Sequence, residues 1–140
     1  MTTPRVTRTD DIEACLALRR TVFIEEQNVP EEIEMDDRDG EAIHLLARRQ
    51  GAPIGTARVL AYGSTIKIGR VCVLAAHRGG GIGVALIEAC HAEGRQAGAT
   101  RAILSAQLPA LSFYERLGYR AYGEVFVDAG IDHCMMEISL

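Results

Sequence analysis

The chain has 140 residues, about the size of one domain, and 48% of them are hydrophobic while 24% are charged. These values exclude a disordered or collagen-like chain. The formal net charge of −4 argues against a general nucleic-acid binder, although it leaves room for a local basic pocket around an anionic ligand. We expect a single domain over residues 1–140.

The first half of the chain predicts a short strand, a helix and an antiparallel meander. Residues 5–8 form the strand, and Asp10 with Glu13 predicts a capping box at the start of a helix that ends near Gln27. Pro30 stops this helix, and residues 31–39 form an acidic loop. Apolar patterning then predicts strands at residues 43–47, 54–61 and 65–74, joined by short turns.

The second half alternates helices and strands. A helix is expected from Ile82 to about Ala97, with a strand at residues 101–105 after it. Pro109 is expected at the first position of another helix, and strands at residues 119–128 and 131–138 close the chain as a hairpin. The order β-α-β-β-β-α-β-α-β-β predicts a mixed α/β fold.

Cysteine and histidine usage favours a protein of a reducing compartment without a metal. No CxxC pair joins the cysteines, and each has apolar neighbours, so we expect free thiols. The scattered histidines form no recognisable zinc motif. Because neither a signal peptide nor a membrane-spanning run is visible, we expect a cytoplasmic protein with no membrane partner.

A glycine-rich loop between a strand and a helix is the most informative feature, and it spans residues 78–83. Glycines allow a backbone to turn sharply and approach a ligand, and the following helix offers unpaired amides that suit phosphate or pyrophosphate. A P-loop would need a lysine after the glycines, and a dinucleotide fingerprint would need GxGxxG; both are missing. The pattern R-x-x-G-x-G is matched by Arg78, Gly81 and Gly83.

That pattern resembles the pyrophosphate loop of the GNAT acyltransferases, which bind acetyl-CoA. Residues 71–86 look like the central motif of this family, and residues 110–119 look like its second motif, A-x-x-F-Y-x-x-x-G-F. The opening of the chain is similar to the narrower ElaA-like branch, through Leu18-Arg19, Val22-Phe23, Glu26-Gln27, Pro30, Glu34, Asp36 and Asp39.

The resemblance implies a cofactor site made largely of backbone. Its strand would splay from the next parallel strand and pair with the pantetheine arm of acetyl-CoA, and an amide near Val73 would polarise the thioester. Gln107 is expected to contact the pantetheine or the substrate, and Phe113 to pack near the adenine or the core. The full set of expected cofactor-binding residues is Val71, Cys72, Val73, Arg78, Gly79, Gly80, Gly81, Ile82, Gly83, Gln107, Phe113 and Tyr114.

The same resemblance assigns Tyr114 as the acid that protonates the departing CoA thiolate, whereas packing alone would make it a core aromatic. Glu34 and His133 are our candidates for the base, with Asp36 and His44 behind them. Cys72 is expected to be structural, because the family transfers the acyl group directly. Most of the acidic loop is expected to be a solvated charge run, and its charge favours a cationic acceptor.

Together these features predict an N-acetyltransferase that moves an acetyl group from acetyl-CoA to a primary amine of a small molecule, peptide or protein. The alternative is an inactive acyl-CoA-binding sensor or interaction module. A nucleotide-binding protein is a third interpretation, and the missing lysine and GxGxxG argue against it. A homodimer is compatible with the terminal strands.

Overall fold

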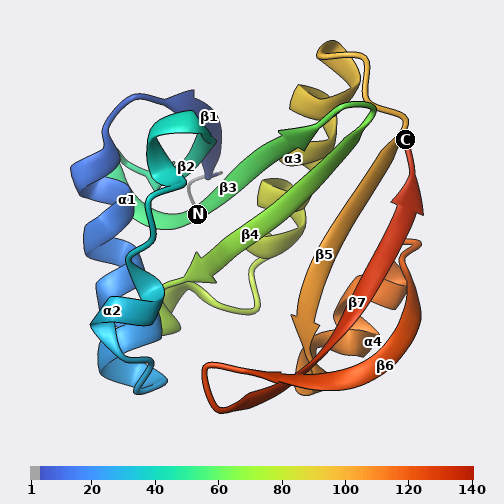
Figure 1. Ribbon diagram of the computed structural model, residues 1–140. Helices are drawn as coiled ribbons and strands as arrows, with labels where there is room; N and C mark the ends of the chain where they lie inside the picture. The colour runs from blue at the N-terminus through green and yellow to red at the C-terminus, as the bar shows by residue number, and fades with distance from the viewer. Residues whose placement is uncertain (1–3) are drawn as a thin grey trace.

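The computed structural model describes residues 4–140. Seven strands form one mixed sheet in the order β1-β2-β3-β4-β5-β7-β6 (Figure 1). The strands are β1 (Arg5–Thr9), β2 (Ile43–Arg49), β3 (Ala52–Tyr62), β4 (Thr65–Val73), β5 (Arg101–Gln107), β6 (Arg120–Asp128) and β7 (Ile131–Ser139). The α-helices are α1 (Ile12–Arg19), α2 (Glu31–Glu34), α3 (Ile82–Gln96) and α4 (Leu111–Arg116).

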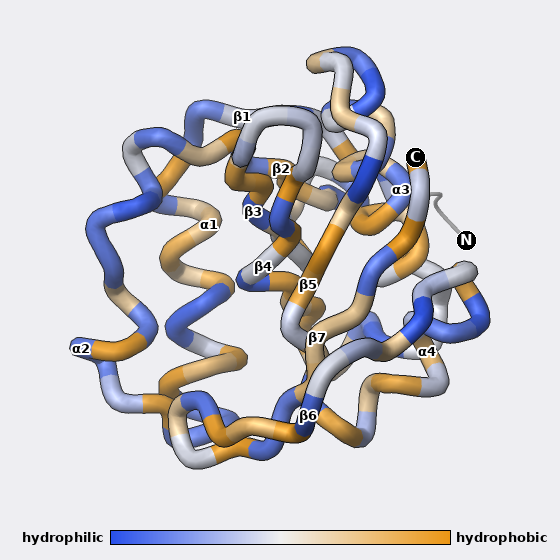
Figure 2. Tube along the Cα trace, turned by 45° about the vertical axis from the view of Figure 1, so that its right-hand side comes forward, coloured by the Kyte–Doolittle hydropathy of each residue, from blue (hydrophilic) through white to orange (hydrophobic). Residues whose placement is uncertain are grey.

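Helices cover both faces of the sheet, as alternation along the strands shows. Leu45 packs into a core with Leu86 of α3, whereas the next residue, Leu46, packs with Cys15 of α1. Successive side chains of a strand point to opposite faces, so α1 and α3 lie on opposite sides. β5, in the middle of the sheet, is apolar over most of its length (Figure 2). This arrangement confirms the predicted mixed α/β fold.

The predicted meander is confirmed, and it ends in a separation of two parallel strands. β2, β3 and β4 are antiparallel neighbours, and β4 then runs parallel to β5. The parallel pairing covers only residues 65–68 and 101–104, after which the strands diverge (Figure 1). A register shift opposite Thr56 and Arg58, together with a φ of 52° at Arg70, turns β4 away from β5.

The first helix differs from its prediction in two ways. Its N-cap is Asp11, which accepts a hydrogen bond from the Ala14 amide at 3.2 Å, so the predicted Asp10–Glu13 capping box is wrong by one residue. The helix also leaves α geometry at Arg20 and continues as a π-helical segment, η1 (Arg20–Glu26). Hydrophobic periodicity predicted one continuous helix here, and Val22 is buried in the π-helical segment.

Three further boundaries depart from expectation. The acidic segment contains α2 and a 3₁₀ turn, η2 (Asp39–Glu41), rather than an open loop. Pro109 lies in a 3₁₀ turn, η4 (Leu108–Ala110), ahead of α4. A third such turn, η3 (Ala75–His77), separates β4 from the glycine loop. Within residues 4–140 no helix has the length and apolar character needed to span a bilayer.

A glycine on β3 supports the end of β4 and provides a test of the packing. A Cβ at Gly55 would lie 3.0 Å from the carbonyl oxygen of Cys72 and 3.2 Å from Cδ1 of Leu86. Because backbone cannot yield, Gly55→Ala is expected to lower the free energy of unfolding by about 1–3 kcal/mol in urea denaturation. Gly69→Ala is the matched strand control, since nothing lies within 4 Å of its Cβ. Equal midpoints for the two variants would contradict this packing.

Candidate active site

A cavity of about 530 Å³ opens where β4 and β5 separate. Residues from η1, α2, β3, β4, β5, α4, β6 and β7 line it. Its volume is that of a small-molecule site. The cavity brings together five of the predicted site residues, namely Glu34, Val71, Gln107, Tyr114 and His133.

The glycine loop lies at the N-terminus of α3 and has the geometry of an anion site. Gly79 and Gly81 adopt φ angles of 85° and 82°, which glycine tolerates best. Among the described residues, no backbone carbonyl accepts a hydrogen bond from the amides of residues 79–84. These amides and the positive end of the 15-residue helix therefore suit a phosphate group. Phe113 closes against the loop, since a Cβ at Gly83 would lie 3.2 Å from its Cζ.

Arg78 is tied to neighbouring elements instead of pointing at the loop amides. Its Nη1 and Nη2 donate to Glu26 at 2.7 and 2.8 Å, and its Nε donates to the carbonyl oxygen of Val73 at 2.9 Å. The hydrogen bonds from Arg78 lower the pKa of Glu26. This contact links the end of η1 to the last residue of β4, next to the glycine loop.

The side chain of Cys72 points away from the cavity. It packs under α1 with Cys15 and Leu46. Burial raises the pKa of Cys72 to about 12, so the thiol stays protonated and is a poor nucleophile. The expected structural role of this cysteine fits that position. Its backbone still forms part of the β4 edge that β5 leaves unpaired.

Tyr114 projects from α4 into the wall of the cavity. Its ring meets Phe113 and Tyr119 edge-on, with centroid separations of 5.0 and 5.8 Å. Burial raises the pKa of Tyr114 to about 12. The phenol therefore remains protonated throughout the neutral range, as a proton donor must.

His133 is buried on β7 and lines the cavity. Its Nδ1 lies 2.7 Å from the carbonyl oxygen of Ile131, and its ring stacks on Phe126. A neutral imidazole satisfies this contact by donating from Nδ1, which assigns the lone pair to Nε2. That nitrogen makes no hydrogen bond to residues 4–140, so it is available to accept a proton.

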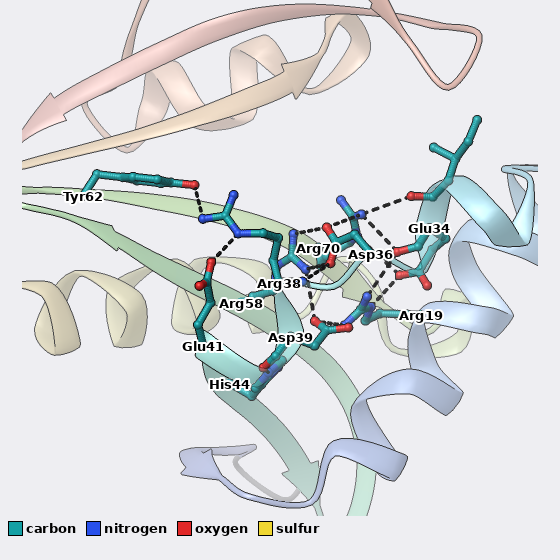
Figure 3. Close-up of polar contacts among 11 residues, drawn as sticks. Arg19, Glu34, Asp36, Arg38, Asp39, Glu41, His44, Arg58, Tyr62 and Arg70 are labelled. Carbon is teal, nitrogen blue, oxygen red and sulfur yellow. Dashed lines mark hydrogen bonds and ion pairs between the residues drawn. The ribbon is translucent and has the colours of Figure 1, made fainter.

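Glu34 belongs to a buried network of charges that we call the ion-pair cluster (Figure 3). Its Oε1 lies 2.5 Å from Nε of Arg19 and 3.4 Å from Nε of Arg70. Asp39 and Asp36 accept from Arg58 at 3.0 and 2.8 Å. The members of the cluster are Arg19, Arg58, Arg70, Glu34, Asp36 and Asp39.

The cluster corrects the expectation of a solvated acidic run for these carboxylates. Hydrogen bonds from Arg58 lower the pKa of Asp36 to about 2 against the cost of burial. Burial by itself raises the pKa of Asp39, but the hydrogen bonds and charges of Arg19 and Arg58 together outweigh it, so this pKa is also lowered. The six charges of the cluster sum to zero, so this part of the acidic segment presents little net field. Nε2 of His44 lies 2.9 Å from the carbonyl oxygen of Asp39, and His44 is outside the set of described residues that line the cavity.

Sequence reasoning missed several polar residues of the cavity wall, and four of them matter most here. Arg58 and Arg70 lie within apolar strands and were not linked to the acidic segment, although a charge in such a strand is itself a signal. Lys67 and Ser105 carried no motif. Within the described part of the chain, no group of three His, Cys, Asp or Glu side chains suits a metal ion.

Comparison with known proteins decides the family. The family model for an acetyltransferase (GNAT) domain matches residues 10–140. The chain belongs to the GNAT family. It is 36% identical over 128 residues to the Bacillus subtilis N-acetyltransferase YjcF, covering 91% of each chain. It is 33% identical over 133 residues to Escherichia coli ElaA, covering 88% of this chain and 84% of ElaA.

Solved structures agree with this assignment. An acyl-CoA N-acyltransferase from Pseudomonas aeruginosa matches the GNAT domain with a TM-score of 0.83 and 33% identity, over 98% of this chain and 99% of that one. A Bacillus subtilis acetyltransferase in complex with CoA shares the fold, with a TM-score of 0.75 at 16% identity over 99% of each chain. The predicted family and its ElaA-like relatives are thereby confirmed.

The low pKa of Asp36 predicts a pH-dependent contribution to stability. The carboxylate titrates at 3.8 when unperturbed and at about 2 in the fold, so its stabilisation is present above pH ~4 and is lost as pH falls through about 2. Asp36→Asn is expected to lower the free energy of unfolding by about 2 kcal/mol near neutral pH. The difference between wild type and variant is expected to shrink as the pH is lowered. Urea denaturation at a series of pH values measures this. Asp37→Asn, at an exposed neighbour, is the control; a loss that does not change with pH would contradict the assignment.

Proposed function

We propose that this GNAT domain transfers an acetyl group from acetyl-CoA to the primary amine of an acceptor bound in the cavity. One observation carries the proposal. A glycine loop with unpaired amides lies at the end of the strand whose unpaired edge borders a cavity containing Tyr114 and His133. In acetyl-CoA, the pyrophosphate needs the loop amides, the extended pantetheine arm needs the unpaired strand edge, and the thioester carbonyl needs the cavity with its acid and base.

The backbone supplies most of the cofactor contacts in this proposal. The amides of Gly79, Gly80, Gly81, Ile82 and Gly83 hold the pyrophosphate. Val71, Cys72 and Val73 pair with the pantetheine arm along the edge of β4 that lacks a β5 partner. The Val73 region also polarises the thioester carbonyl. Gln107 borders this path, where it now donates to Gln27 at 2.9 Å.

The chemistry requires one proton acceptor and one proton donor. Nε2 of His133 accepts the proton of the attacking amine, whose nitrogen bonds to the thioester carbonyl carbon. The C–S bond then breaks, and Tyr114 donates its proton to the CoA sulfur. We favour His133 over Glu34 as the base, because Arg19 and Arg70 hold the Glu34 carboxylate in ion pairs. Glu34 is assigned a positioning role.

The setting of the reaction is part of the proposal. All four cysteines are free and buried, which supports a reducing, cytoplasmic environment. The partners are acetyl-CoA and an amine acceptor, without a nucleic acid or a membrane. A homodimer is compatible with the exposed outer strand β6. The competing candidate, an acyl-CoA sensor without turnover, would not need Tyr114 and His133 to share a cavity.

Cofactor binding is the first test, and Gly80 allows a matched pair of variants. A Cβ at this position meets nothing closer than Nη2 of Arg49 at 3.8 Å, so Gly80→Ala is accommodated. Gly80→Glu places a carboxylate beside the pyrophosphate. Calorimetry is expected to give a Kd on the order of 1 μM for acetyl-CoA, unchanged in Gly80→Ala and at least about tenfold weaker in Gly80→Glu.

ATP and NAD are the controls of this experiment, and neither is expected to bind with comparable affinity. Absence of acetyl-CoA binding, or stronger binding of ATP or NAD, would reject the acyltransferase proposal. Acetyl-CoA binding without turnover of any amine would favour the sensor.

Substitutions at Tyr114 and His133 separate catalysis from binding. Tyr114→Phe keeps the ring and removes the proton, so kcat is expected to fall about 10²-fold while Kd for acetyl-CoA stays constant. His133→Asn is expected to lower kcat/KM by a similar factor. CoA release from an amine panel measures both. Full activity in Tyr114→Phe would contradict the catalytic role and leave Tyr114 as a packing residue of the core.

A further inference from the structure

We propose that the acceptor amine carries an anionic group, a carboxylate or a phosphate, and that Lys67, Arg70 and Ser105 bind this group. The inference rests on the proposed function, because it names the class of acceptor for the same cavity. Each of these residues lines the cavity: Lys67 belongs to the last half of the β4–β5 pairing, and Arg70 and Ser105 lie just beyond it. The acidic segment had favoured a cationic acceptor, and this proposal departs from that expectation.

Lys67 is a cation without a partner. Its neighbours Ile66 and Ile68 are buried in the core with α3, so strand alternation directs Lys67 to the opposite face, where it lines the cavity. It is half-buried, and it forms no ion pair or hydrogen bond with any residue from 4 to 140. An ammonium at the cavity wall that has no protein counter-charge is open to a bound anion.

Arg70 is a second cation on the same strand, and one of its donors makes no hydrogen bond. Its Nη2 donates to the carbonyl oxygen of Glu34 at 3.0 Å and lies 3.3 Å from Asp36. Its Nε is buried and lacks a hydrogen bond, although it lies within ion-pair range of Glu34. The side chain is 26% exposed at the cavity wall. The guanidinium is thus held in place by α2 and retains donor capacity towards the cavity.

Ser105 adds a neutral donor at the point of separation. It follows Leu104, the last β5 residue that pairs with β4. Its Oγ is buried and has no hydrogen-bond partner in the described chain. A buried hydroxyl without a partner is uncommon, because its desolvation is not compensated. An ammonium, a guanidinium and a hydroxyl together form a donor set that suits a carboxylate or phosphate oxygen.

The carboxylates of the cavity leave little attraction for a purely cationic acceptor. Glu34 and Asp36 are already bound to arginines of the ion-pair cluster. Asp128, at the end of β6, is the cavity carboxylate that no cation contacts among residues 4–140. It borders the β6–β7 turn, close in sequence to His133. The acceptor ammonium is therefore directed towards the β7 side, and its anionic group towards Lys67.

Matched amines with and without the negative charge test this assignment. One pair is β-alanine and β-alaninamide, and the other is phosphoethanolamine and ethanolamine, so the two arms also distinguish carboxylate from phosphate. In each pair CoA release is compared at equal concentration. The anionic member of at least one pair is expected to have a kcat/KM about tenfold higher.

Variants assign any such preference to these residues. Lys67→Met is expected to abolish the preference for the anionic amine, because only that amine reacts more slowly. Lys67→Arg is expected to retain the preference. Ser105→Ala is expected to reduce it about threefold. Arg38→Met is the control, since this cavity-lining cation already contacts Glu41 and Tyr62. The Arg38→Met variant is expected to keep the wild-type preference for the anionic amine.

A binding measurement separates this inference from the proposed function. Calorimetry with N-acetyl-β-alanine and its amide, in the presence of CoA, reports the anion contact without turnover. Tighter binding of the acid that requires Lys67 supports the inference even if no amine is acetylated. Three outcomes would overturn the inference: equal turnover rates within both pairs, faster turnover of the uncharged members, or an anion preference that Lys67→Met does not change. Each of them would leave the acetyltransferase proposal standing.

Discussion

The end of the pairing between β4 and β5 is the constraint on which the rest of the structure depends. Four residues of each strand pair, and then the register shift and the left-handed backbone of Arg70 turn β4 away. The separation exposes one edge of β4, opens the cavity and directs the chain towards the glycine loop. A cofactor path and an acceptor cavity thus arise from a single interruption of the sheet.

The ion-pair cluster holds the segment that covers this opening. It connects Arg19 of α1 with Glu34 of α2 and with arginines from β3 and β4. Burying charges is costly, and mutual pairing recovers only part of that cost, so such clusters specify an arrangement more than they add stability. Here the arrangement is the placement of α2 at the wall of the cavity. Removing one carboxylate leaves the cluster with one uncompensated positive charge, which explains the expected loss in Asp36→Asn.

The local features of the fold could be predicted from the sequence, and its long-range pairings could not. Apolar periodicity and glycine placement predicted the meander, α3 and the anion loop, because each depends on neighbouring residues. The insertion of β7 between β5 and β6 depends on contacts between distant segments. The pairing of Glu34 also depends on a distant segment, since its partner Arg70 lies 36 residues away along the chain.

Charge in the cavity illustrates why composition misleads about ligands. A run of acidic residues attracts cations only while its charges are uncompensated, because opposite charges at contact distance cancel the field beyond them. Arg19, Arg58 and Arg70 provide that compensation from three separate elements. The selectivity of the site then depends on the charges left without partners. Lys67 is such a charge, and its position in the cavity wall makes it available to an anion that enters.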